Sequence, residues 1–140
     1  MSRVLGVDLG ARRIGLARSD ATGTLASPLR VLERSGDVIA DHRAIVATAR
    51  DEEADRIVVG FPRSLSGDEG PAARAVRAEV EELRVVAGDD VTVVVHDERF
   101  TTVTAERHLV EAGVGRAARR RVRDAAAAAV MLQSYLEASR

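Results

Sequence analysis

The stretch VLGVDLGARRIGLAR, residues 4–18, decides the fold of this chain. Val4 to Leu9 is almost entirely apolar, which is the pattern of a buried central strand. Gly10 to Arg13 predicts a tight turn, and Ile14 to Arg18 predicts a returning antiparallel strand. Ser27 to Glu33 predicts a third strand. The chain therefore opens with a three-stranded meander and not with a strand–helix–strand unit.

Helices and strands alternate along the rest of the chain. Periodicity and end signals predict helices over residues 38–53, 71–86 and 119–138, a helix from Thr101 or Thr102 that ends before Gly113, strands over residues 56–60 and 91–95, and a loop over residues 61–70. A meander followed by this alternation predicts an α/β fold with a mixed five-stranded sheet and helices on both faces. We expect one domain over residues 1–140.

The composition limits the classes of protein and of chemistry. The chain has 140 residues, 46% of them hydrophobic, and a formal net charge of −1. It has no cysteine, which excludes disulfides, thiolate catalysis and cysteine-based metal sites. The N-terminal apolar run is too short for a signal peptide, and no stretch approaches the roughly 20 apolar residues of a membrane span. We therefore expect a cytoplasmic protein.

Two aspartates occupy positions where a charge is costly. Asp8 lies near the end of an apolar strand, where an unpaired buried carboxylate costs several kcal/mol and so needs a cation or strong donors. The alternative is an aspartate that caps the turn at Gly10. Asp124 lies on the apolar stripe of the last predicted helix, and the alternative there is a first-turn acid that interacts with the helix dipole. The other members of that stripe are Ala128, Met131, Leu132 and Tyr135.

Asp97 and Glu98 follow the strand at residues 91–95. If that strand continues, two-residue periodicity puts Glu98 on one face with Thr92, Val94 and His96; the alternative is an ordinary polar loop. Each acid alone is a weak signal, but Asp8, Glu98 and Asp124 form a pattern from distant parts of the chain. Converging carboxylates suit Mg²⁺ or Mn²⁺, and two such ions activate water and stabilise the leaving oxygen in phosphodiester cleavage.

Arginines are candidates for holding a polyanion. All 21 basic residues are arginine, which a GC-rich genome explains more simply than selection for phosphate contacts does. A dense cluster precedes Asp124, and its alternative is a solvated helix start. The nucleic-acid-binding candidates are Arg12, Arg13, Arg99, Arg116, Arg119, Arg120, Arg121 and Arg123.

The histidines have no ligand spacing. His42 and His108 lie in predicted helices, where we expect them on the surface. His96 adjoins the acidic pair, and a structural role is favoured over proton transfer.

In the helix over residues 38–53, the residues near one face are Ile39, Ile45, Val46 and Ala49.

Four motifs together resemble the YqgF/RuvX family. The similar segments are GVDLGARRIGLARSD at 6–20, VGFP at 59–62 with Gly67, HDERFTT at 96–102 with Ala105 and Glu106, and DAAAAAVMLQSYL at 124–136. They cover nearly the whole chain in the family's order. Departures from the family pattern are Arg12 in place of a frequent lysine, Phe61 and Phe100 in place of frequent leucines, and Arg123 in place of an apolar residue. None of these removes a carboxylate.

The resemblance implies a ribonuclease-H-like fold related to Holliday-junction resolvases. It implies that Asp8, Glu98 and Asp124 are catalytic and bind the metal, Mg²⁺ or Mn²⁺. The function it implies is a nuclease that matures the 5′ end of precursor 16S ribosomal RNA in ribosome biogenesis. The expected partners are precursor rRNA, precursor ribosomal particles or branched DNA, bound by a monomer or a homodimer.

Three other functions share parts of this pattern. A junction resolvase would use the same chemistry as a dimer, because it makes two symmetric cuts. A non-catalytic RNA-binding assembly factor would fit the loss of a carboxylate, but all three are present. An actin-like ATPase has a similar strand–turn–strand phosphate loop, but it binds nucleotide between two domains, for which this length leaves no room.

Overall fold

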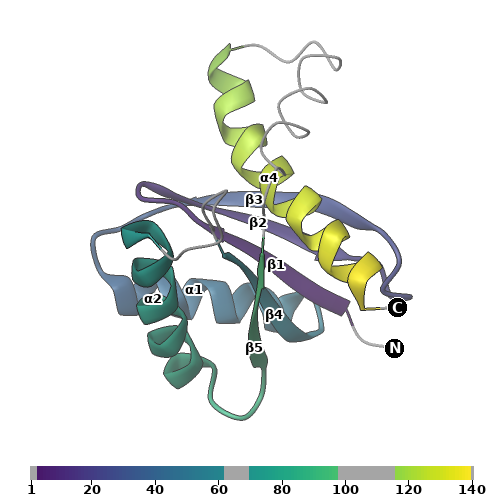
Figure 1. Cartoon of the computed structure of the whole chain (residues 1–140), viewed down its shortest axis with the longest axis horizontal. Helices are drawn as coiled ribbons and strands as arrows, with labels where there is room; N and C mark the ends of the chain where they lie inside the picture. The colour runs from purple at the N-terminus through teal and green to yellow at the C-terminus, as the bar shows by residue number, and fades with distance from the viewer. Residues whose placement is uncertain (1–2, 62–69, 98–115, 140) are drawn as a thin grey trace.

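A computed structural model of the protein describes residues 3–61, 70–97 and 116–139, with the backbone alone for residues 116–124. In chain order the elements are β1 (Arg3–Leu9), β2 (Arg13–Ser19), β3 (Ala26–Glu33), α1 (Val38–Asp51), β4 (Ala54–Phe61), α2 (Pro71–Ala87), β5 (Thr92–Asp97) and α4 (Arg116–Ala138) (Figure 1). The helix predicted to begin at Thr101 or Thr102 and most of the predicted loop lie outside the described residues. No helix in the described part of the chain is both long and apolar enough to cross a membrane.

The five strands form a mixed sheet in the order β3–β2–β1–β4–β5. β2 lies antiparallel to both β1 and β3. β4 is parallel to β1, and β5 is parallel to β4. The predicted mixed sheet is thus confirmed, and the apolar β1 occupies its centre.

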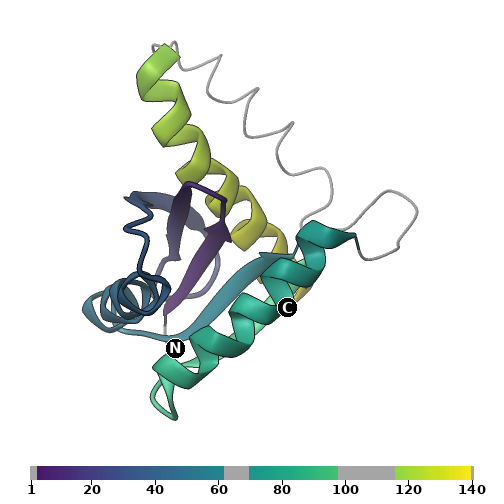
Figure 2. The same ribbon diagram turned by 90° about the vertical axis from the view of Figure 1, so that its left-hand side faces the viewer.

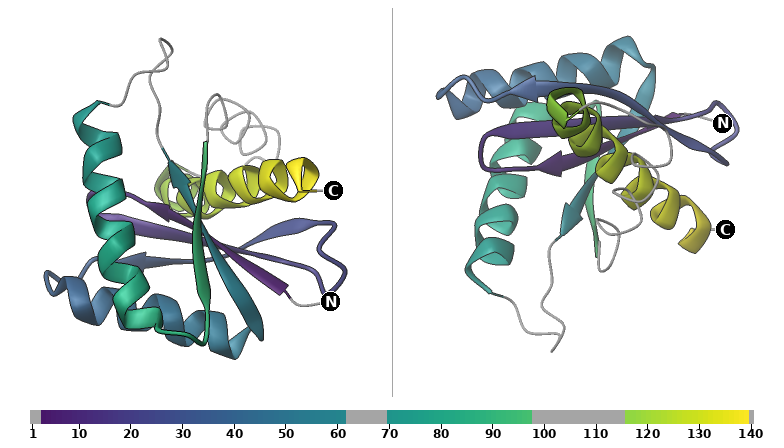
Figure 3. Two further views of the ribbon diagram at one scale, coloured as in Figure 1. Left: turned by 60° about the horizontal axis from the view of Figure 1, so that its bottom comes forward. Right: turned by 90° about the horizontal axis from the view of Figure 1, so that it is seen from above.

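Helices cover both faces of the sheet, because alternate side chains of the central strands point to opposite sides. Leu5 and Val7 of β1 are fully buried in the core shared with α1 and α2. On the other face, Ala17 and Val58 pack with the buried residues of α4. Figure 3 shows the strands running between α1 and α2 on one side and α4 on the other.

The helix ends follow local chemistry. The Asp37 side chain caps α1 by accepting a hydrogen bond from the backbone N–H of Ala40, 3.1 Å away. Pro71 opens α2, where its missing N–H costs nothing, and Gly88 ends it with φ of 63°. α1 ends at Asp51, two residues before its predicted end, and Glu53 then takes a left-handed φ of 58°.

One expectation for α1 is wrong. His42 is fully buried and not on the surface, because it lies next to the carboxylate of Glu79 in α2. Ile39 has helical spacing with the buried residues, yet it is 55% exposed. It lies in the first turn of α1, where it forms part of a groove wall. By contrast, Ile45, Val46 and Ala49 are buried.

Candidate functional site

Asp8 lies half-buried near the end of β1, on the sheet face that α4 covers. Gly6, two residues earlier, identifies this face. A Cβ added to Gly6 would stand 2.9 Å from Cβ of Leu132 and 3.3 Å from the carbonyl oxygen of Ala128. Because side chains alternate along a strand, Asp8 shares the face of Gly6.

Glycines flank Asp8 in both neighbouring strands. In β2 its register partner is Gly15. In the parallel strands, Gly6 pairs with Val58 and Val58 with Val94, so two residues further along the same face come Asp8, Gly60 and His96. The positions paired with Asp8 in both neighbouring strands are therefore glycines, which carry no side chain.

The helix that contains Asp124 packs on this same face. Ala128, Met131 and Leu132 are fully buried, and Tyr135 packs partly buried against them, so the predicted apolar stripe of α4 is confirmed over these residues. Asp124 lies one helical turn before Ala128. Figures 1 and 2 show the first turns of α4 extending past the strands.

Two of the three predicted metal ligands cannot be placed by their side chains. Glu98 directly follows β5 and lies outside the described residues, as does the side chain of Asp124. Among the side chains that the structure does describe, no three His, Cys, Asp or Glu residues are grouped to hold a metal ion. The structure thus brings Asp8 and the Asp124-bearing helix to one face of the sheet, and the assembled triad remains a prediction.

The turn after Asp8 contains two of the candidate arginines. The backbone N–H of Gly10 donates to the carbonyl oxygen of Arg13 at 2.9 Å. A Cβ on Gly10 would stand 2.5 Å from that oxygen, so the turn requires glycine. Arg12 is exposed, whereas Arg13 is half-buried, with its Nε 3.5 Å from Oε1 of Glu33.

The structure does not describe the side chains of the remaining candidate arginines. Arg99 lies outside the described residues. The arginines in the first turns of α4 are placed by backbone only; they are Arg116, Arg119, Arg120, Arg121 and Arg123.

His96 is held by α4. Its Nε2 lies 3.0 Å from Oγ of Ser134, and its ring meets that of Tyr135 edge-on, with centroids 5.7 Å apart. Burial lowers the pKa of His96, and the nearby charge of Asp97 opposes that effect. These contacts favour the structural role for His96 and confirm that it faces α4, as does Val94.

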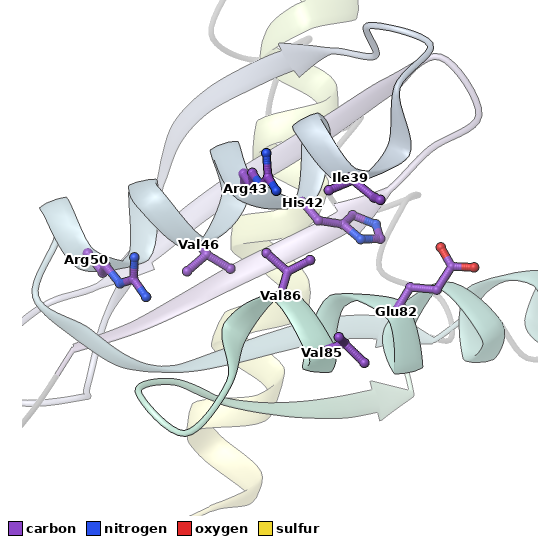
Figure 4. Close-up of a pocket in the computed structure, with 8 residues that line it drawn as sticks. All are labelled: Ile39, His42, Arg43, Val46, Arg50, Glu82, Val85 and Val86. Carbon is purple, nitrogen blue, oxygen red and sulfur yellow. The ribbon is translucent and has the colours of Figure 1, made fainter.

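A groove of about 950 Å³ lies between α1 and α2, on the opposite face of the sheet from Asp8 (Figure 4). Ile39, Val46 and Val86 are among its lining residues. The groove is mainly apolar and includes none of the predicted site residues. It is therefore separate from the candidate site.

Sequence reasoning missed one residue beside the site. Arg34 contacts the turn between β1 and β2, and its guanidinium is paired with Glu79. The only signal in the sequence was an arginine immediately after the third predicted strand, which is too common to single out.

The chain is similar to known proteins along almost its whole length. Residues 2–138 match the family described as "RuvX: Holliday junction resolvase". A protein of Desulforudis audaxviator named "Putative pre-16S rRNA nuclease" is 42% identical over 134 residues, which cover 96% of this chain and 93% of that protein. A Streptomyces avermitilis protein of the same name is 46% identical over 139 residues, which cover 99% and 87%.

A solved structure confirms the fold. "T. thermophilus RuvC in complex with Holliday junction substrate" matches with a TM-score of 0.60 and 18% identity, covering 99% of this chain and 96% of that one. At this identity the match supports the ribonuclease-H-like fold alone. The family match and the two relatives go further: this chain belongs to the RuvX family.

Proposed function

We propose that this protein is a divalent-metal-dependent endonuclease that matures the 5′ end of precursor 16S rRNA. Asp8, Glu98 and Asp124 are its proposed catalytic and metal-binding residues. The observation that carries the proposal is the close packing of α4 on Gly6, which puts the helix containing Asp124 over the strand containing Asp8. The names of the RuvX relatives support the choice of substrate.

The donor set fits Mg²⁺ or Mn²⁺. All three proposed ligands are carboxylates, the hard oxygen donors that these cations prefer. Asp8 is half-buried and flanked by glycines, a position suited to a group that must meet a ligand. When bound, such a cation activates water and stabilises charge on the phosphate oxygens. The chain's own part is to hold the three carboxylates on one face of the sheet.

The arginines near this face would hold the substrate. Arg12 is exposed in the turn, three residues after β1 ends, and Arg13 and Arg99 are further candidates. The arginine-rich first turns of α4 extend past the sheet (Figure 2), and we expect their arginines to contact the phosphate backbone. Contacts of this kind position a phosphate backbone without reading its sequence. We propose that the protein acts in the cytoplasm on precursor rRNA or on precursor ribosomal particles.

The proposal is tested by cleavage of an end-labelled RNA that spans the 5′ region of precursor 16S rRNA, with Mn²⁺ or Mg²⁺. Wild type is expected to cut it only when metal is added. Asp8→Asn is expected to reduce cutting to background, because it removes a charged ligand. Asp55→Asn is the matched control, since Asp55 is exposed at the start of β4. Equal cutting by Asp8→Asn and wild type would exclude Asp8 from the site.

A labelled four-way DNA junction, run in parallel, tests the second candidate function, which the description of the family favours. Symmetric junction cleavage with intact RNA, from a protein that is a dimer in solution, would assign a resolvase. If neither substrate is cut and Asp8→Asn binds RNA like wild type, a non-catalytic assembly factor becomes the better account.

A further inference from the structure

Arg34, the residue directly after β3, reaches the turn that joins β1 to β2. Its backbone N–H donates to the carbonyl oxygen of Arg12 at 2.9 Å. Its side-chain Nε donates to the carbonyl oxygen of Gly10 at 2.8 Å. One residue therefore holds two carbonyls of the turn that begins two residues after Asp8.

The rest of the guanidinium is anchored in the helices. Nη1 and Nη2 of Arg34 donate to the two carboxylate oxygens of Glu79 in α2, at 2.9 and 3.0 Å. The same carboxylate lies 2.8 Å from Nε2 of His42 in α1, which is fully buried. We call Arg34, Glu79 and His42 the clamp. Through it, one planar group connects the turn to both helices on the far face of the sheet.

The clamp is charged and largely shielded from water. The Arg34 and Glu79 side chains are only 19% and 18% exposed. The hydrogen bonds that Arg34 donates to Glu79 raise the pKa of Arg34 against the effect of burial, helped by the charges of Glu79 and Asp41. A bidentate ion pair that is shielded from water keeps one geometry more strictly than an ion pair on the surface does. The pair with Glu79 therefore fixes the orientation of the Arg34 guanidinium.

If the ion pair served only to stabilise the fold, Arg34 would need no side-chain hydrogen bonds other than the two to Glu79. The third donor of Arg34 is aimed at Gly10, in the turn between the proposed metal ligand Asp8 and the exposed Arg12. We propose that Arg34 is a positioning residue of the nuclease site, which fixes the turn and thereby the relative placement of Asp8 and Arg12. This inference rests on the proposed function.

The test compares Arg34→Lys with Arg30→Lys. Lysine keeps the charge opposite Glu79, but its single ammonium cannot replace the three-nitrogen fork. Arg30 is the matched control, because it lies in β3, four residues before Arg34, and donates to Thr48 of α1, away from the turn. Glu79→Gln is a second variant that removes the charge of the anchor and retains a hydrogen-bond acceptor, should Arg34→Lys fail to fold.

Three quantities are measured on the whole protein: amide exchange at Gly10 and Arg34, Mn²⁺ affinity by electron paramagnetic resonance, and kcat and KM for the RNA. Arg34→Lys is expected to speed exchange at both amides about tenfold and to weaken Mn²⁺ binding. It should lower kcat on the order of tenfold to hundredfold with little change in KM, because a small displacement of a reacting group has that effect. Arg30→Lys should leave all three near wild type.

The outcomes separate the two proposals. If Arg34→Lys matches Arg30→Lys in kcat and in Mn²⁺ affinity, the clamp is a structural ion pair and the inference is overturned, even if turn exchange is faster. If wild type cuts no substrate, the proposed function fails. Turn exchange and Mn²⁺ affinity then still decide whether Arg34 positions a metal-binding Asp8.

Discussion

Gly6 of β1 lies against Leu132 of α4 so closely that a Cβ on Gly6 would stand 2.9 Å from Cβ of Leu132. Carbon atoms pack best at about 3.5–4.0 Å, so only glycine allows this approach. The same contact sets how near the first half of α4 comes to the end of β1. The glycine is thus a packing requirement with a consequence for the site, because Asp8 and Asp124 lie on the two elements that it joins.

Gly6→Ala is therefore expected to destabilise the protein by about 1–3 kcal/mol, because the added methyl overpacks the contact with α4. Urea unfolding measures this free energy. Gly70→Ser is the control: among the described residues, a Cβ there meets nothing within 4 Å, and serine can cap α2. The control should be unchanged or more stable by roughly a few tenths of a kcal/mol. Equal stability of Gly6→Ala and wild type would show that α4 does not need the glycine.

Glu53 has a φ of 58° in an exposed turn between α1 and β4, a conformation that L side chains adopt at a cost. Glu53→Gly should relieve that cost and raise the free energy of unfolding by up to about 1 kcal/mol, after the loss of chain entropy is subtracted. Glu53→Ala keeps the Cβ and should gain nothing. Thermal unfolding compares the two variants, and a glycine variant less stable than the alanine variant would contradict the left-handed conformation of Glu53.

Glu79 makes stability depend on pH in the acid range. Burial by itself raises the pKa of Glu79, but hydrogen bonds and charges from Arg34 and His42 outweigh it, so the pKa lies below its ordinary value of 4.5. A lowered folded-state pKa contributes stability that is present above the unfolded value and is lost as pH falls through the folded value. The groups that face it are Arg34 after β3 and, in α1, His42, with Asp41 close to Arg34.

Wild type should accordingly lose stability more steeply than Glu79→Gln as the pH falls below about 4.5. The difference in free energy of unfolding between the two proteins, measured from pH 7 to pH 3, should shrink in that window. A difference that stays constant over the whole range would mean that Glu79 is not the charged centre of the clamp.

Much of the fold could be predicted because β1 and its neighbours have simple patterns. The apolar run at Val4 to Leu9 identified the central strand, and the β-branched runs identified β4 and β5. Boundaries were less exact: α4 begins at Arg116, three residues before its predicted start. Helix periodicity does not distinguish the charged first turns of a helix from solvent-exposed coil.

The site was only partly predictable, for a physical reason. Asp8 stands out in sequence because a carboxylate interrupts an apolar strand, and that is a local property. His42 was assigned to the surface because its burial depends on Glu79, 37 residues away, and no local pattern reports such a pair. Arg34 was missed for the same reason. Networks of buried polar groups are defined by the tertiary structure, and they leave little periodicity in the sequence.

The central claim is that Asp8 and Asp124 belong to one metal site, and Mn²⁺ binding tests it most directly. Electron paramagnetic resonance of free Mn²⁺ would compare wild type, Asp8→Asn, Asp124→Asn, the double variant and Asp55→Asn. We expect each single substitution in the site to weaken binding at least about tenfold, the double variant to be scarcely weaker than either single one, and Asp55→Asn to match wild type. Wild-type affinity in Asp124→Asn, or losses that add as independent sites, would contradict the account.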